Sequence, residues 1–294
     1  MSAGIQNHQS GSGMQNNYNA AGTQNISFVN SFNAATSHPL KSLWDAVAGV
    51  GASHDAEQQY ERGECLPGTR EKVIRNIWEW ILSKGKELPI CWLSGTAGVG
   101  KTAIAMTVAK AAEEEGRLVC SFFFFRSDPR RNNPSALVLT IAHGLVVTNP
   151  SCRVLIDRRI SDNPKILEAR MEDQFRELVL KPYGLEHQTP SMSQKVNKWS
   201  GWIWKFLRKV LLTRTEVPNL VIIDGLDECG DERAQQRVLS MIQSAFLTSP
   251  DLPLRFLICS RPEAWLQEAF ADDSLSRLSK SIPLTNNSNL LKTS

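Results

Sequence analysis

The chain has 294 residues, of which 41% are hydrophobic and 21% are charged, and its formal net charge is +3. This length and composition suit one large domain with appendages. The near-neutral charge argues against a dedicated nucleic-acid-binding protein, which usually carries a strong basic excess. The N-terminus lacks the regions of a secretory signal, and no apolar run reaches the ~18 residues of a membrane span. We therefore expect a cytoplasmic protein that binds no nucleic acid.

The first 40 residues contain no Asp, Glu, Lys or Arg and are rich in Asn, Gln, Ser and Gly. Such a segment buries too little apolar surface to fold alone, so we expect disorder. It contains an internal echo, GMQN at 13–16 and GTQN at 22–25. Uncharged Asn/Gln-rich sequence can stack into cross-β ladders, and the echo resembles the amyloid signalling motifs of some fungal receptor-type NTPases. A solvated tail and an assembly motif both remain open.

Residues 41–66 look like a helical linker, and residues 67–285 alternate helix-period and strand-like patterns. The expected strands are 90–95, 117–125, 219–224 and 254–260. The expected helices follow the turn at Pro67-Gly68 up to Gly85 and then cover 101–115, 134–147, 169–182 and 231–247, with Pro262 in the first turn of another. Strands that alternate with helices predict a parallel α/β sheet, and residues 286–294 are expected to be a tail.

The six cysteines are scattered and form no Cys-x-x-Cys pair. Cys91, Cys120 and Cys259 lie in or beside the expected strands, where a cysteine behaves as a small apolar residue. We expect the cysteines to be reduced and structural.

The stretch GTAGVGKT fits G-x-x-x-x-G-K-[ST] directly after an expected strand and before an expected helix, which is the context of a P-loop. Its glycines let backbone N–H groups form an anion nest, and the helix N-terminus adds partial positive charge. Lys101 is predicted to reach the β- and γ-phosphates, and Thr102 to hold Mg²⁺. The predicted nucleotide-binding residues are Gly95, Thr96, Ala97, Gly98, Val99, Gly100, Lys101 and Thr102.

The run NLVIIDGLDECG, residues 219–230, places three carboxylates directly after an apolar strand. Like charges side by side repel, so a cation should lie there. We predict Asp224 as the Walker B ligand of Mg²⁺ and Glu228 as the base that activates water, with Asp227 either as a further metal ligand or as a group that supports one. Arg261 ends the next expected strand and could contact a γ-phosphate.

These residues together resemble the NACHT-type modules of the STAND class of P-loop NTPases, especially fungal NLR-like proteins with a nephrocystin-3-like N-terminal NTPase. The resemblance covers roughly residues 65–285 and rests on CLPGTREKVIRNIWEWI, WLSGTAGVGKTAIA, SFFFFRSDPRRNNPSALVLTIAHGL, VIIDGLDEC and RFLICSRPE.

This resemblance implies a three-layer α/β/α core that binds ATP or GTP with Mg²⁺ and hydrolyses it slowly as an oligomerisation switch. It matches Gly95, Gly100, Lys101 and Thr102 to the phosphate loop. It matches Asp224, Asp227 and Glu228 to the Walker B cluster, and Arg261 to a sensor arginine. It also places PGTR, residues 67–70, near the adenine base, and it gives no role to Arg126 or Arg131.

Two departures from the family pattern are expected. The chain ends at Ser294, without the family's winged-helix region and C-terminal repeats, and residues 183–218 look like an insertion. Within that insertion, residues 195–214 combine basic residues and tryptophans at helical spacing, a pattern that can lie on an anionic membrane or in a partner groove. We favour a helix packed on the core, or an extra stretch from an imperfect gene model, over membrane contact.

The favoured function is a weak NTPase that acts as a signalling switch of the innate-immunity or heterokaryon-incompatibility type, with self-association or a full-length relative as its partner. The alternative is a non-catalytic nucleotide-binding scaffold or decoy. A small-molecule kinase is a third option, but no acceptor signature accompanies it.

Overall fold

Five parallel strands form the centre of the folded part of the chain. The computed structural model describes residues 38–59, 63–83, 88–184 and 218–285, so the predicted tail before residue 38, nearly all of the predicted insertion and the end of the chain after residue 285 lie outside the described residues. The strands are β1 (Ile90–Gly95), β2 (Leu118–Phe123), β3 (Leu220–Asp224), β4 (Arg255–Ser260) and β5 (Ser279–Leu284). Their order is β2-β3-β4-β1-β5, and every neighbouring pair is parallel.

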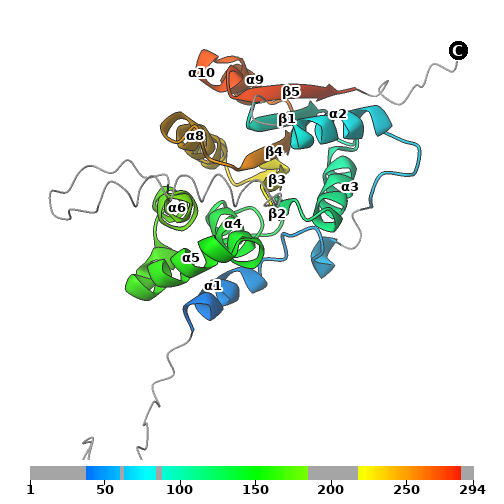
Figure 1. The fold of residues 1–294 in the computed structure, drawn as a ribbon. Helices are drawn as coiled ribbons and strands as arrows, with labels where there is room; N and C mark the ends of the chain where they lie inside the picture. The colour runs from blue at the N-terminus through cyan, green and yellow to red at the C-terminus, as the bar shows by residue number, and fades with distance from the viewer. Residues whose placement is uncertain (1–37, 60–62, 84–87, 185–217, 286–294) are drawn as a thin grey trace, which may run out of the picture. The chain divides into compact units, whose positions relative to one another are not determined.

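Helices cover both faces of the sheet, which confirms the predicted three-layer α/β/α fold (Figure 1). One face carries α2 (Glu71–Leu82) and α3 (Lys101–Glu114). The other face carries α4 (Ser135–Thr148), α6 (Met171–Phe175), α8 (Glu232–Thr248), α9 (Ala264–Ala271) and α10 (Asp273–Ser276). On this second side α1 (Pro39–Ala48) and α5 (Pro150–Asp162) pack against α4.

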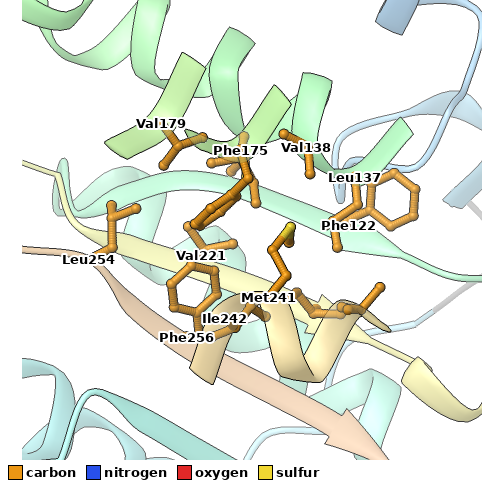
Figure 2. Close-up of a cluster of buried hydrophobic side chains, with 14 of the residues drawn as sticks. Phe122, Leu137, Val138, Phe175, Val179, Val221, Met241, Ile242, Leu254 and Phe256 are labelled. Atoms are coloured by element: carbon orange, nitrogen blue, oxygen red, sulfur yellow. The ribbon is translucent and has the colours of Figure 1, made fainter. Parts of the chain in front are cut away.

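Side chains along each strand alternate between the two helical layers, as the pleat requires. In β3, Leu220 and Ile222 face α2 and α3, whereas Val221 and Ile223 face the opposite cluster. Figure 2 shows that second cluster, where side chains of β2, β3 and β4 meet those of α4, α6 and α8. Because both faces are buried, the central strands are nearly continuous apolar runs, and that made them recognisable in the sequence.

The fit between α4 and the sheet is close. Gly144 of α4 lies so near the carbonyl oxygen of Val119 in β2 that a Cβ atom would overlap it. Glycine is therefore required at this one position inside an otherwise apolar helix.

The structure corrects several predicted elements. Helix α1 begins at Pro39, so the predicted tail of residues 1–40 is two residues too long. The predicted helix 169–182 is instead α6 followed by a π-helical turn (Arg176–Leu180) and a 3₁₀ turn (Lys181–Tyr183). Pro262 does not lie in a first helical turn, because α9 begins at Ala264.

Six further elements were not predicted. Three of them are the helices α5 and α10 and the strand β5. The other three are the 3₁₀ turns η1 (Glu57–Gln59), η2 (Pro164–Glu168) and η5 (Leu226–Glu228). Strand β5 is the edge strand beside β1, and exposed residues interrupt its burial pattern. A half-exposed edge strand has no continuous apolar run, which explains why the sequence pattern did not reveal it.

The cysteine prediction is confirmed. All six cysteines are free, and Cys91, Cys120 and Cys259 are buried in β1, β2 and β4. Within the described ranges, none of the helices combines the length and hydropathy that crossing a membrane requires.

Candidate functional site

The carboxyl ends of β1, β4 and β3 lie side by side at one edge of the sheet. Open parallel sheets bind ligands in the crevice beyond these ends. The P-loop follows β1, the acidic run follows β3, and Arg261 follows β4. They enclose a cavity of about 240 Å³ that is lined by Ala97, Gly98, Gly100, Lys101, Thr102, Asp224, Gly225, Asp227, Glu228 and Arg261.

Most of the predicted site residues therefore surround one cavity. Gly95 and Thr96 line a neighbouring cavity of about 380 Å³ between the end of β5 and α9. The side chain of Val99 is buried in the core below the loop, so only its backbone can face a ligand.

The backbone of the loop has the shape of an anion site. Gly98 and Gly100 have φ angles of 74° and 95°, in the region that glycine adopts readily and other residues avoid. Helix α3 begins directly at Lys101, and no side chain caps its N-terminus. The first N–H groups of this fourteen-residue helix thus open toward the cavity with the positive end of the helix dipole.

Lys101 places its ammonium group against the loop itself. Its Nζ atom donates to the carbonyl oxygens of Gly95 at 2.6 Å and Thr96 at 2.9 Å. Partial burial lowers the pKa of Lys101 below its usual value, while the nearby carboxylates of Asp227 and Asp224 oppose that shift. A cation is thus held beside the acidic cluster.

Thr102 and Asp224 come from separate elements and meet directly. The Thr102 hydroxyl donates to Oδ2 of Asp224 at 2.8 Å, and Asp224 is buried. Magnesium is bound in proteins by one or two oxygen ligands together with substrate phosphates and water. This hydroxyl and carboxylate, next to a loop shaped for phosphates, fit a magnesium–polyphosphate pair.

Asp227 is engaged by Arg261 on both of its oxygens. The backbone N–H of Arg261 donates to Oδ1 at 2.9 Å, and the guanidinium Nε lies 3.2 Å from Oδ2. Asp227 is buried, whereas the Arg261 side chain is half-exposed and lines the cavity. Of the two roles left open for Asp227, this geometry favours support of a neighbouring group over direct metal binding.

Glu228 lies at the rim of the cavity, at the end of the turn η5. Its Oε2 atom accepts the backbone N–H of Arg126 at 3.2 Å. The Arg126 guanidinium donates to the carbonyl oxygen of Asp227 at 2.8 Å. The sequence had suggested no role for Arg126. The available signal was its position just after the strand that pairs with β3.

Arg70 joins the site from the start of α2. It is the single non-glycine residue with positive φ in the described ranges, at 58°. Its guanidinium donates to the carbonyl oxygens of Val99 at 2.7 Å and Thr285 at 3.1 Å. The PGTR segment therefore lies against the P-loop, although its expected contact with an adenine base stays a prediction. Arg131 instead pairs with Asp128 and covers the ring of Phe125, outside the cavity.

Comparison with known protein families identifies the family of this chain. The model of the family described as "Nephrocystin 3, N-terminal" matches residues 68–196 and 182–261, well over half of the chain. The chain belongs to the nephrocystin 3 N-terminal family. The matched part of this nephrocystin-3-like domain begins two residues before Arg70 and ends at Arg261, so it contains the whole candidate site. The two matched segments overlap at residues 182–196, and all of this overlap except residue 182 lies within the predicted insertion. A search of curated proteins found no match.

Proposed function

We propose that this nephrocystin-3-like domain binds a nucleoside triphosphate, ATP or GTP, with Mg²⁺ and hydrolyses it slowly. The observation that carries the proposal is the hydrogen bond between Thr102 and Asp224. It joins Thr102, at the end of the P-loop, to Asp224, at the end of β3. The hydroxyl and the carboxylate that would hold the metal therefore lie together beside the glycine-rich loop that would bind phosphate.

The P-loop and each charged residue of the cavity have a role in this proposal. The N–H groups of the loop and the ammonium of Lys101 bind phosphate oxygens. Thr102 and Asp224 hold Mg²⁺, which would neutralise phosphate charge when bound. Arg261, oriented by Asp227, reaches toward the terminal phosphate, and Glu228 accepts a proton from the attacking water.

We further propose that the domain belongs to the NACHT-type STAND NTPases and that nucleotide binding switches its self-association, or its association with a full-length relative. The support is the combined set of motifs and their convergence at one sheet edge. A non-catalytic scaffold is the competing function, and the described fold suits both. Turnover that depends on Glu228 separates them, since a scaffold does not change when Glu228 becomes glutamine.

Calorimetry of Lys101→Ala with ATP, ADP and GTP in the presence of Mg²⁺ tests the binding site. Loss of a charged hydrogen-bond donor is worth about 1.5–3 kcal/mol, so we expect affinity to fall at least about tenfold. Lys110→Ala is the matched control, because Lys110 lies on the same helix but pairs with Glu64 at the surface. Unchanged affinity in Lys101→Ala would rule out this site. Sizing of the wild type with and without nucleotide tests the switch.

A further inference from the structure

We propose that Arg126 is a positioning residue that holds Glu228 in place for its work as the base. The inference rests on the proposed function and adds a residue to it. Arg126 follows β2, whereas the acids follow β3, so the support would come from the neighbouring strand of the sheet.

Arg126 makes two hydrogen bonds to consecutive residues of the turn η5, Asp227 and Glu228. The backbone N–H of Arg126 donates to the Glu228 carboxylate, and its guanidinium donates to the Asp227 carbonyl. The first contact sets the direction of the carboxylate and leaves its second oxygen able to accept a proton. The second contact holds the backbone at Asp227, directly before Glu228.

The segment around Arg126 is itself tied to the acidic loop. The N–H of Phe124 donates to the carbonyl oxygen of Asp224 at 2.9 Å, which continues the pairing of β2 with β3. Asn132 donates its side-chain amide to the Arg126 carbonyl at 3.1 Å and accepts the N–H of Gly230 at 2.8 Å. Hydrogen bonds thus connect the loop after β2 with the loop after β3 at three places: before Glu228, at Glu228 and after it.

Arg126 does not itself line the cavity, whereas Glu228 does. Its effect on hydrolysis should therefore pass through Glu228 and not through direct contact with phosphate. A general base must lie within hydrogen-bond reach of the water it activates, so loosening its support lowers the rate while leaving ligand affinity unchanged.

Amide hydrogen exchange in the nucleotide-free protein tests the contact first. The backbone N–H of residue 126 is expected to exchange about tenfold faster in Glu228→Ala, which removes its acceptor, and in Arg126→Ala, which loosens that hydrogen bond, than in the wild type. Arg130→Ala is the matched control, since Arg130 lies in the same loop but donates to the Gly49 carbonyl. Equal exchange in wild type and Glu228→Ala overturns the proposal, whether or not the protein binds nucleotide.

Steady-state hydrolysis and ATP calorimetry test the consequence. We expect Arg126→Ala to lower kcat about tenfold with unchanged ATP affinity, a part of the ~10²–10⁴ that a general base supplies. Arg126→Lys should recover part of the rate, because an ammonium can still donate to the Asp227 carbonyl. In the Glu228→Gln background, Arg126→Ala should have no further effect.

Besides equal hydrogen exchange, three results overturn the inference while leaving the proposed function standing. The first is a weaker ATP affinity in Arg126→Ala. The second is a fall in kcat on adding Arg126→Ala to Glu228→Gln that is as large as the fall in the wild type. The third is a fall in kcat in Arg130→Ala as large as that in Arg126→Ala. The first two would mean direct action on the ligand, and the third a general effect of the loop. If the wild type binds no nucleotide at all, the proposed function itself is wrong.

Discussion

Three carboxylates coexist within five positions after β3 because each has its own partner. Asp224 accepts the Thr102 hydroxyl, Asp227 is paired with Arg261, and Glu228 accepts the Arg126 N–H. Unpaired like charges in a buried place are costly, and hydrogen bonds to each acid offset that cost. The free protein therefore tolerates its acidic cluster through contacts that come from three different strand ends.

The pairing of Asp227 with Arg261 leads to a prediction at this scale. We expect a coupling free energy of about 2 kcal/mol between Asp227→Asn and Arg261→Ala, since the Asp227 carboxylate is buried and the guanidinium Nε of Arg261 lies 3.2 Å from it. The backbone N–H of residue 261 is kept in Arg261→Ala, so its bond to Asp227 does not enter this coupling. Urea unfolding of both single variants and the double variant, without nucleotide, measures it.

The exposed pair of Glu172 with Arg237 is the control cycle, with an expected coupling below about 1 kcal/mol. A coupling at the site no larger than that of the exposed pair would contradict the assignment of Asp227 as the support of Arg261.

At the scale of elements, α5 shows what a periodicity search can miss. Its charged residues mask a narrow apolar stripe, Cys152, Ile156 and Ile160, that is buried at helical spacing. Its start is marked by Asn149, which accepts the N–H groups of Ser151 and Cys152, and by a proline at the first position. Asparagine followed by proline is a helix-start signal that the sequence did contain.

Removal of that cap should destabilise the fold. Asn149→Ala is expected to lower the free energy of unfolding by about 1 kcal/mol, because two N–H groups lose their acceptor. Asn149→Ser should lose much less, since serine is an effective N-cap. Chemical denaturation measures both variants, and equal losses in the two would show that the cap is not the stabilising contact.

The turn η5 and the strand order work together at the same scale. Because β4 lies between β1 and β3, Arg261 at its end stands between the P-loop and the acids. The turn begins at Gly225, with a φ of 72°, which bends the chain sharply after Asp224. Asp227 and Glu228 are thereby brought back over the strand ends.

For the whole molecule, the buried thiols predict sensitivity to alkali. Burial raises the pKa of Cys152 from 9.0 to about 11 and that of Cys229 to about 12, and it also raises the pKa values of Cys120 and Cys259. The thiols ionise in the unfolded chain above pH 9 but stay protonated in the folded one. The unfolded state then binds fewer protons, so stability falls as pH rises.

We expect the free energy of unfolding to fall between pH 9 and about 11 by up to about 1.4 kcal/mol per pH unit for each such thiol. The lowered pKa of Lys101 acts in the opposite direction, but it is one group against four thiols, and burial also raises the pKa of Tyr183, which adds to the fall above pH 10. Urea titrations across this range measure the slope. Cys152→Ala should flatten it by the share of one thiol, and a slope unchanged in that variant would refute the explanation.

Local patterns in the sequence determined much of this protein. Strands β1 to β4, the P-loop between β1 and α3, and the acids after β3 were all predicted, because buried strands and phosphate loops depend on residues that are adjacent in the chain. The convergence of Lys101, Thr102, Asp224 and Arg261 at one edge followed from the parallel arrangement alone.

The tertiary structure alone decided which side chains meet. Asp227 pairs with a residue 34 positions away, and Arg126 reaches the Asp227 carbonyl across 101 positions. Strand order and register set such contacts, and neither is written in a local pattern. Strand β5 was missed for a different reason: unlike β2 at the opposite edge, it is only partly buried, so its residues form no continuous apolar run.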